Sequence, residues 1–217
     1  MREACHEQLD AIHDDVVALT RRVRNAVEDA TKALQGADIG AAETSIADGD
    51  SIQAGAKWIE SRCIEVLSLQ QPVAGDLRLL VATLGMLADL ERTGALAVHI
   101  AKIARMRYPN YAVAEPARGT IAQMAEISIS MVDRLAAAIA SRDPDAGRQL
   151  DDLDDSMDQL RKFTFDVAKD DDWTYGVEAA IDLALLGRYY ERIADHAVRA
   201  ARSVGYIVTG KVQRTSN

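Results

Sequence analysis

Apolar residues recur every three or four positions along most of this chain, the spacing that gathers them on one face of an α-helix. The first such stretch runs from Leu9 to Leu34 and stops before Gly36, which predicts a single helix of about 30 residues. No stretch alternates apolar and polar residues as a half-buried strand does. We therefore expect an all-α protein.

Helix-capping and helix-breaking residues place the next elements. Asp38 is expected to cap a second helix that ends at Gln70-Gln71-Pro72, and a third helix then runs from about Pro72 to Arg107. The segment 108–116 is the clearest linker. Beyond it the pattern predicts three further helices, at about 117–141, 144–170 and 174–209.

The sequence around Asp143 indicates where the middle helix of the second set begins. An aspartate can accept hydrogen bonds from the first backbone N–H groups of a helix, and proline is favoured at the first helical position. Asp143-Pro144 therefore predicts an N-cap and the residue after it. Asp154 would then lie about ten residues inside the helix, where the helix dipole no longer favours an acid.

Three helices, a linker and three more helices indicate an internal duplication. Matching residues lie at an offset of 105 in the first helices and of 100 in the third helices: Val27, Leu34 and Asp38 match Val132, Ile139 and Asp143, and Glu91, Arg92 and Ala97 match Glu191, Arg192 and Ala197. We expect two tandem antiparallel three-helix bundles, residues 1–108 and 116–210, each about 45 Å long.

Composition narrows the range of partners. The 217 residues are 48% hydrophobic, enough to bury a core, and their formal net charge of −9 repels nucleic acid. The chain has no basic amphipathic run that would bind a membrane surface, no secretory signal at its start and no stretch of about 20 apolar residues. We expect a soluble, cytoplasmic protein in which Cys5 and Cys63 are reduced thiols.

A carboxylate pair distinguishes the second repeat from the first. Residues four apart share a helix face, so Glu191 and Asp195 project side by side, whereas their counterparts are Glu91 and Ala95. Asp154 and Asp158 form a second such pair on the preceding helix; their counterparts are Gly49 and Gln53. Carboxylates brought together in this way repel one another.

A hard cation would relieve that repulsion, and oxygen ligands suit magnesium, manganese, calcium or iron, with zinc also open and copper disfavoured. The sequence thus predicts a metal site at Asp154, Asp158, Glu191 and Asp195, and a weak or lost site in the first repeat, where Glu91 is left. Two alternatives remain: the acids form a solvated face, or Arg188 and Arg192 pair with Glu191 and Asp195.

Other chemistries find less support in the sequence. The chain has no glycine-rich phosphate loop and no Ser/His/Asp or Cys/His arrangement, so we do not expect an enzyme. Glu3-x-x-His6 and Asp10-x-x-His13 resemble the signature of di-iron bundles, but both lie on one helix, whereas that site needs the motif on two. His99 and His196 are interpreted as packed or surface residues.

Three segments in the right order resemble the PhoU family of phosphate-uptake regulators. They are the turn between the second and third helices and the two acidic motifs, at 70–78, 89–95 and 191–197. The resemblance covers essentially the whole chain. It implies a six-helix all-α protein, often a homodimer, that binds metal ions through the acidic motifs.

The resemblance also implies a role. Such a protein is a cytoplasmic negative regulator that links the ATPase of the phosphate ABC transporter to the sensor histidine kinase of the phosphate two-component system. It would act as an adaptor, without turnover and without inserting into the membrane. Two alternatives from other classes are a carboxylate-bridged metal enzyme or metal store, and a bundle whose acidic faces bind nothing.

Overall fold

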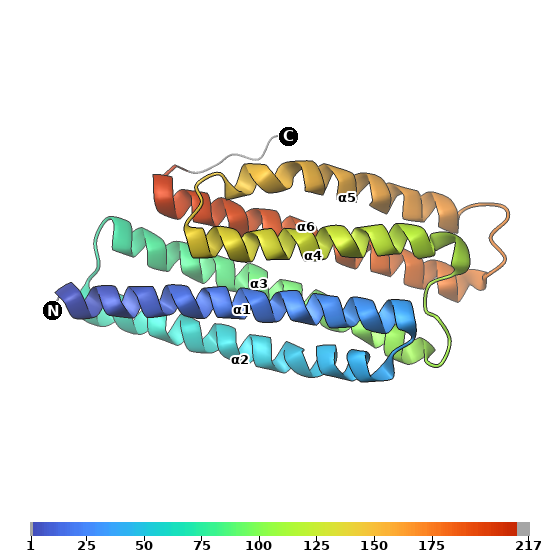
Figure 1. Cartoon of the computed structure of the whole chain (residues 1–217), viewed down its shortest axis with the longest axis horizontal. Helices are drawn as coiled ribbons and strands as arrows, with labels where there is room; N and C mark the ends of the chain where they lie inside the picture. The colour runs from blue at the N-terminus through green and yellow to red at the C-terminus, as the bar shows by residue number, and fades with distance from the viewer. Residues whose placement is uncertain (1, 212–217) are drawn as a thin grey trace.

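The structure is a computed structural model that describes residues 2–211, and their side chains from residue 6 onward. Within this range the chain is helical and contains no strand, which confirms the all-α prediction (Figure 1). The elements are α1 (Arg2–Gly36), α2 (Ile39–Gln70), α3 (Gly75–Arg107), the 3-10 helix η1 (Glu115–Ala117), α4 (Arg118–Ser141), α5 (Ala146–Ala168) and α6 (Gly176–Thr209).

The ends of the helices show which sequence signals act locally. The Asp38 carboxylate accepts a hydrogen bond from the backbone N–H of Ala41 at 3.0 Å, so it caps α2 as predicted. The predicted start of α5 is wrong by two residues, because the helix begins at Ala146 and Asp145 is its N-cap. The Asp143 carboxylate instead accepts from the N–H of Asp145 at 2.9 Å, which stabilises a turn before the helix.

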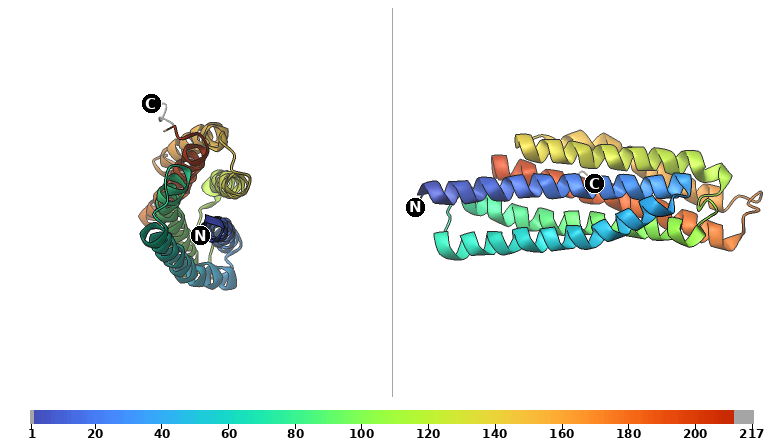
Figure 2. Two further views of the ribbon diagram at one scale, coloured as in Figure 1. Left: turned by 90° about the vertical axis from the view of Figure 1, so that its left-hand side faces the viewer. Right: turned by 60° about the horizontal axis from the view of Figure 1, so that its bottom comes forward.

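Each repeat is an antiparallel three-helix bundle, as the duplication predicts. Helices α1, α2 and α3 pack against one another, and α4, α5 and α6 do the same (Figures 1 and 2). The two bundles join where α3 packs antiparallel to α6 and α1 packs beside α4. Seen end-on, the helices form a crescent with α1 and α4 on its concave side (Figure 2).

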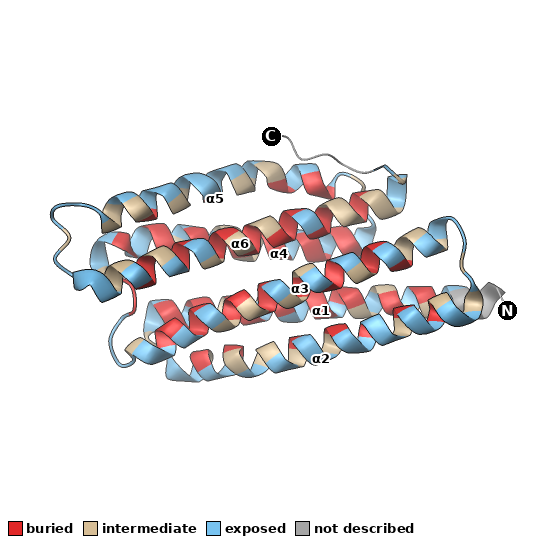
Figure 3. Ribbon diagram, turned by 180° about the vertical axis from the view of Figure 1, so that it is seen from behind, coloured by how far each residue is buried: buried red, intermediate tan, exposed pale blue. Residues whose placement is uncertain are grey.

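Small and aliphatic side chains fill the core. Ala97, Ala101, Ala197 and Ala201 are buried on α3 and α6, and alanine permits a close approach of neighbouring helices. Helices α2 and α5 lie at the outside and expose much of their surface (Figure 3). Cys63 on α2 is a free thiol whose pKa burial raises to about 11; the side chain of Cys5 lies outside the described residues.

The joint between the repeats is approximately symmetric. At one end the Arg107 guanidinium lies 2.6 Å from the Asp182 carboxylate and 2.7 Å from that of Glu178. At the other end Arg78 donates to the carbonyl of Ile207 at 3.2 Å. At the offset of 100, Arg78 corresponds to Glu178 and Arg107 to Ile207, so the same two positions meet at both ends. No described helix combines the length and apolar character needed to cross a membrane.

Candidate functional site

Two of the predicted ligands come together where α5 packs on α6. Asp154 is half-buried on α5, and burial together with the negative charges of Asp195 and Asp158 raises the pKa of its carboxyl to about 6. Asp195 on α6 lines the same pocket as Asp154 on α5. Asp158, one turn further along α5, is exposed. Repeat-specific acids thus lie on facing helices, as expected.

Glu191 is buried, and arginines surround it. Burial and the charge of Asp195 raise the pKa of its carboxyl, while Arg188 and Arg161 act in the opposite direction. The Nη1 group of Arg188 donates to both carboxylate oxygens, at 2.5 and 2.6 Å, and the Nε of Arg161 lies 3.7 Å from one of them. Glu191 is therefore neutralised by neighbouring arginines in this structure.

Asp195 is also paired, because the Arg192 guanidinium lies 3.2 Å from its carboxylate. The pairing of Arg188 and Arg192 with the two acids of α6 is the second alternative that the sequence left open. Among the residues that the structure describes, no three histidine, cysteine or acidic side chains are grouped so that they could hold a metal ion. The structure thus brings Asp154 and Asp195 together, and the four-residue ligand set stays a prediction.

A pocket of about 450 Å³ opens beside these acids between α5 and α6. The arginine side of this pocket was not predicted from the sequence. The Arg202 guanidinium lies 3.1 Å from the Asp151 carboxylate, and the positive charge of Arg202 lowers the pKa of Asp154. Arg202 lies seven residues after Asp195, on the same helix face, and that spacing could have revealed it. The pocket is lined by Asp151, Asp154, Asp155, Asp195, Val198, Arg199 and Arg202.

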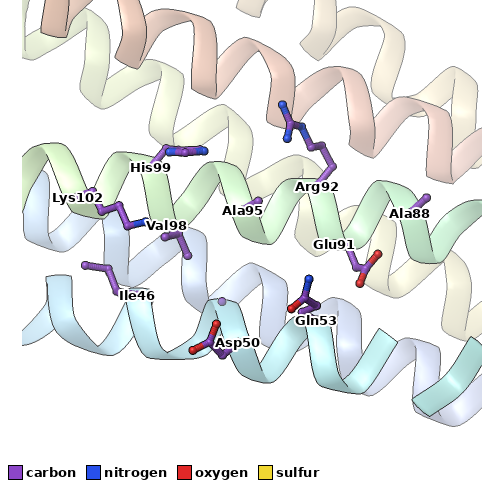
Figure 4. Close-up of a pocket in the computed structure, with 11 residues that line it drawn as sticks. Ile46, Asp50, Gln53, Ala88, Glu91, Arg92, Ala95, Val98, His99 and Lys102 are labelled. Atoms are coloured by element: carbon purple, nitrogen blue, oxygen red, sulfur yellow. The ribbon is translucent and has the colours of Figure 1, made fainter. Parts of the chain in front are cut away.

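The first repeat has a pocket of about 640 Å³ at the equivalent place, between α2 and α3 (Figure 4). Glu91, the predicted remnant of the motif, lines it together with Gln53 and Asp50. Each residue that lines the second-repeat pocket has its counterpart here, at the offset of 105 on α2 and of 100 on α3. The lining residues are Ile46, Gly49, Asp50, Gln53, Ala88, Glu91, Arg92, Ala95, Val98, His99 and Lys102.

Packing explains why the first repeat carries no aspartate at position 49. A Cβ atom built on Gly49 would lie 2.5 Å from the Cγ2 atom of Val98, which is closer than real Cβ contacts come. The counterparts of this pair are Asp154 and Val198, which both line the second-repeat pocket. Helices α2 and α3 therefore approach each other in a way that leaves no room for an acid at this position.

Both histidines make contacts across the joint, at positions that are not equivalent. His196 on α6 is buried, with its Nδ1 atom 2.8 Å from the Asp89 carboxylate of α3, and Arg199 reaches the same carboxylate at 3.1 Å. His99 on α3 is exposed and stacks on the Tyr189 ring of α6, with the ring centroids 5.3 Å apart. Neither histidine belongs to the acidic cluster, in agreement with their interpretation as packed and surface residues.

Comparisons with known proteins give one consistent result. The PhoU domain matches residues 16–104 and 121–204. The chain is 41% identical over 210 residues to the phosphate-specific transport system accessory protein PhoU homolog 2 of Mycobacterium tuberculosis, covering 97% of this chain and 99% of that protein. It is 30% identical over 213 residues to the PhoU homolog of Aquifex aeolicus, covering 95% and 93%.

Solved structures agree with this result. The phosphate transport system regulatory protein PhoU of Streptococcus pneumoniae matches with a TM-score of 0.87 at 23% identity, over 97% of this chain and all of that one. PhoU of Pseudomonas aeruginosa matches with a TM-score of 0.84 at 26% identity, over 95% and 99%. The similarity thus extends over both repeats, their order and their packing, and on these grounds the chain belongs to the PhoU family.

Proposed function

We propose that this protein is a cytoplasmic negative regulator of phosphate uptake and of the phosphate-starvation response. It would act as an adaptor between the ATPase of the phosphate ABC transporter and the sensor histidine kinase, without turnover of its own. The observation that carries this proposal is the match, along nearly the full length of both chains, to proteins named phosphate-specific transport system accessory proteins.

Exposed apolar side chains support the adaptor role. Leu77 and Val81 near the start of α3 are 41% and 53% exposed, and their counterparts Val177 and Ile181 near the start of α6 are 77% and 54% exposed. Apolar groups that gather on a surface commonly mark protein contacts. Because α3 and α6 are antiparallel, the two patches lie toward opposite ends of the molecule, where two partners could bind without interfering with each other.

Pull-downs with the full chain test the adaptor role, using extracts of cells grown with high and with low phosphate. We expect the wild type to recover the transporter ATPase and the kinase, and the double variants Leu77→Ser/Val81→Ser and Val177→Ser/Ile181→Ser each to lose one partner. Ile64→Ser is the matched control, because Ile64 is 53% exposed on α2 and belongs to neither pair.

The negative sign of the regulation has a separate test. Cells that lack the protein should express phosphate-starvation genes even when phosphate is plentiful. Recovery of neither partner by the wild type would refute the adaptor role, and unchanged repression in the deletion strain would refute negative regulation. The implied homodimer is tested by light scattering of the purified protein, where a monomer mass at micromolar concentration would count against it.

We further propose that a divalent or trivalent cation of the magnesium, manganese, iron or zinc group binds at Asp154, Asp158, Glu191 and Asp195. Asp154 and Asp195 line one pocket, and a cation there would relieve the repulsion between their carboxylates, whereas Asp158 and Glu191 would have to turn toward it. Arg188 would have to release Glu191; its side chain is 48% exposed and free to swing outward. When bound, the ion would supply positive charge that holds α5 to α6.

Elemental analysis of the purified protein tests the cation site. We expect bound metal in the wild type and in Asp152→Ala, an exposed acid of α5 outside the pocket, and much less in Asp195→Ala. Equal metal content in Asp195→Ala and the wild type would refute the ligand assignment. Thermal melting with and without chelator provides a second measurement, because a bound ion stabilises the folded state in proportion to its affinity.

A further inference from the structure

Three basic residues lie along one face of α3 at the first-repeat pocket. Arg92, His99 and Lys102 are spaced seven and three residues apart, which sets them on a common side of the helix around Ala95. Ala95 has a small side chain and is only partly buried, so the helix surface between the three basic groups is open to solvent. The pocket thus offers basic groups around an accessible space.

In the second repeat the counterparts of all three basic residues are paired with acids. Arg192 pairs with Asp195 at 3.2 Å, Arg202 with Asp151 at 3.1 Å, and Arg199 with Asp89 at 3.1 Å. At the first-repeat pocket none of these acids has an acidic counterpart, because the corresponding positions hold Ala95, Ile46 and, on α6, Tyr189. The positive groups were kept while their internal partners were lost.

The loss leaves the charges unpaired. In the part of the chain that the structure describes, no carboxylate forms an ion pair with Arg92 or Lys102. Partial burial lowers the pKa of His99, and the positive charges of Lys102 and Arg92 lower it further, so both groups lie within electrostatic reach of the His99 ring. Positive groups that have no ion-paired carboxylate favour the binding of an external anion.

The acids of the same pocket lie on its other side. Glu91 turns toward α2, where Asp50 and Gln53 line the wall, whereas Arg92 and His99 rise from the side of α3 that faces α6 (Figure 4). Arg188 and Arg161, which pair with Glu191, have the counterparts Ala88 and Ala56, so Glu91 lacks these two partners. The basic side is therefore distinct from the acidic side.

We propose that the first-repeat pocket binds an oxyanion of the phosphate class, held by Arg92, His99 and Lys102 in the space over Ala95. Arginine presents several N–H donors, lysine a mobile charge and histidine a further donor, a combination that suits a tetrahedral oxyanion. A volume of about 640 Å³ is ample for inorganic phosphate and also accepts a phosphate carried by a nucleotide. This inference stands independently of the regulatory role proposed above.

Calorimetric titration of the purified full chain with inorganic phosphate, sulfate and adenosine monophosphate tests this site. We expect saturable binding at low ionic strength, weakened about tenfold or more in Arg92→Gln and in Lys102→Gln, because each removes a charge-assisted hydrogen bond. Arg202→Gln is the matched control in the other repeat, where Asp151 already neutralises the arginine, and it should bind as the wild type does.

The most decisive variant restores the acid that the first repeat lacks at position 95. Ala95→Asp should pair with Arg92 as Asp195 pairs with Arg192, and should reduce phosphate binding at least as much as Arg92→Gln does. Ala95→Asn, which has nearly the same size and no charge, should retain most of the binding. Circular dichroism melting establishes that both variants are folded, as expected for a partly exposed helix position.

Several results decide the proposal. Equal affinity for phosphate and for the mononucleotide supports a site that recognises the oxyanion alone. Tighter binding of the mononucleotide supports a site that recognises a phosphate carried by a nucleotide. Phosphate should also raise the pKa of His99 in NMR titrations, because a bound anion favours the protonated ring. Absence of saturable binding for all three anions, or wild-type affinity in Ala95→Asp, would overturn the proposal.

Discussion

The two repeats share a fold and differ in how their charged side chains are paired. In the second repeat, Arg192, Arg202 and Glu191 all have partners of opposite charge within their own bundle. In the first, the counterparts Arg92, Lys102 and Glu91 face a larger pocket without such partners. The apolar core must persist in both copies for either to fold, whereas the pocket residues are free to diverge. Duplication thus produced two equivalent sites with different chemistry.

The difference is fixed by packing as well as by composition. Gly49 lets α2 approach Val98 on α3 too closely for any side chain at that position. A single change at Ala95 can restore one acid, but a complete acidic cluster in the first repeat would also require the Val98 side chain to give way. The comparison can therefore be tested through stability as well as through binding.

The largest expected effect concerns the joint between the repeats. Arg107→Met should lower the free energy of unfolding by about 3 kcal/mol, because the buried Asp182 carboxylate loses its partner at 2.6 Å. Arg78→Met, at the equivalent contact of the other end, should cost about 1 kcal/mol because only a neutral carbonyl loses its donor. Urea unfolding measures both, and equal losses would show that the joint is energetically symmetric.

Reversing the divergence at position 49 should have the next largest effect. Gly49→Asp should destabilise the protein by about 2 kcal/mol, because the new side chain would overlap Val98. The control is Gly85→Asp on the exposed side of α3, where a Cβ meets nothing within 4 Å and the change should be nearly neutral. Adding Val98→Ala to Gly49→Asp should recover part of the loss; no recovery would mean that the clash has another origin.

A smaller and pH-dependent effect should distinguish Asp154 from its neutral counterpart. The pKa of its carboxyl is raised from 3.8 to about 6, so the folded state binds more protons than the unfolded state between these values. The free energy of unfolding should therefore fall as the pH rises from about 4 to 6. Asp154→Asn removes the ionisable group and therefore this pH-dependent loss of stability. At pH 7 the variant should be more stable than the wild type by about 1–2 kcal/mol, and the partial exposure of Asp154 keeps this difference small.

Urea unfolding at pH 3.5 and pH 7 in the presence of chelator measures this effect. The two proteins should be equally stable at the lower pH, where the wild-type carboxyl is protonated in both states. Asp152→Asn serves as the control, because its carboxylate is exposed. A variant Asp154→Asn that is less stable than the wild type at pH 7 would contradict the raised pKa.

The smallest effect compares the paired and the unpaired arginine. Arg192→Gln removes an ion pair at 3.2 Å whose side chains are 33% and 36% exposed, and should cost about 0.5 kcal/mol. Arg92→Gln should leave the free energy of unfolding unchanged, since Arg92 has no such partner. High salt should abolish the difference between the two variants, because it screens exposed charges. A larger cost for Arg92→Gln would show that its charge is compensated elsewhere.

The helices and their duplication could be predicted from local signals. Leu9 to Leu34 set one face of α1, Asp38 capped α2, and Glu91 and Glu191 fixed the relation between the repeats. The start of α5 was less certain, because the Asp143 side chain can stabilise either a helix or the turn before it, and the two forms share the same residues. Which of the two forms is adopted depends on how the whole loop packs.

The site could be predicted only in part. Spacing indicated that Asp154 and Asp195 lie on facing sides of two helices, and they do. Arg161 lies thirty positions before Glu191 in the sequence. Spacing did not show that Arg161 comes within 3.7 Å of the Glu191 carboxylate. Nor did it show that His99 stacks on Tyr189 across the joint. Contacts between distant helices depend on their relative rotation, which no local pattern encodes.

The sequence by itself determined most of the residues that face the core, the ends of the helices to within about three residues, and which acids the second repeat holds and the first lacks. Tertiary structure decided the rest: which arginine neutralises which acid, how closely Gly49 lets α2 approach α3, and that two equivalent pockets lie open on the surface. Helix periodicity follows from backbone geometry and is local, whereas charge pairing depends on distances of a few ångströms between helices.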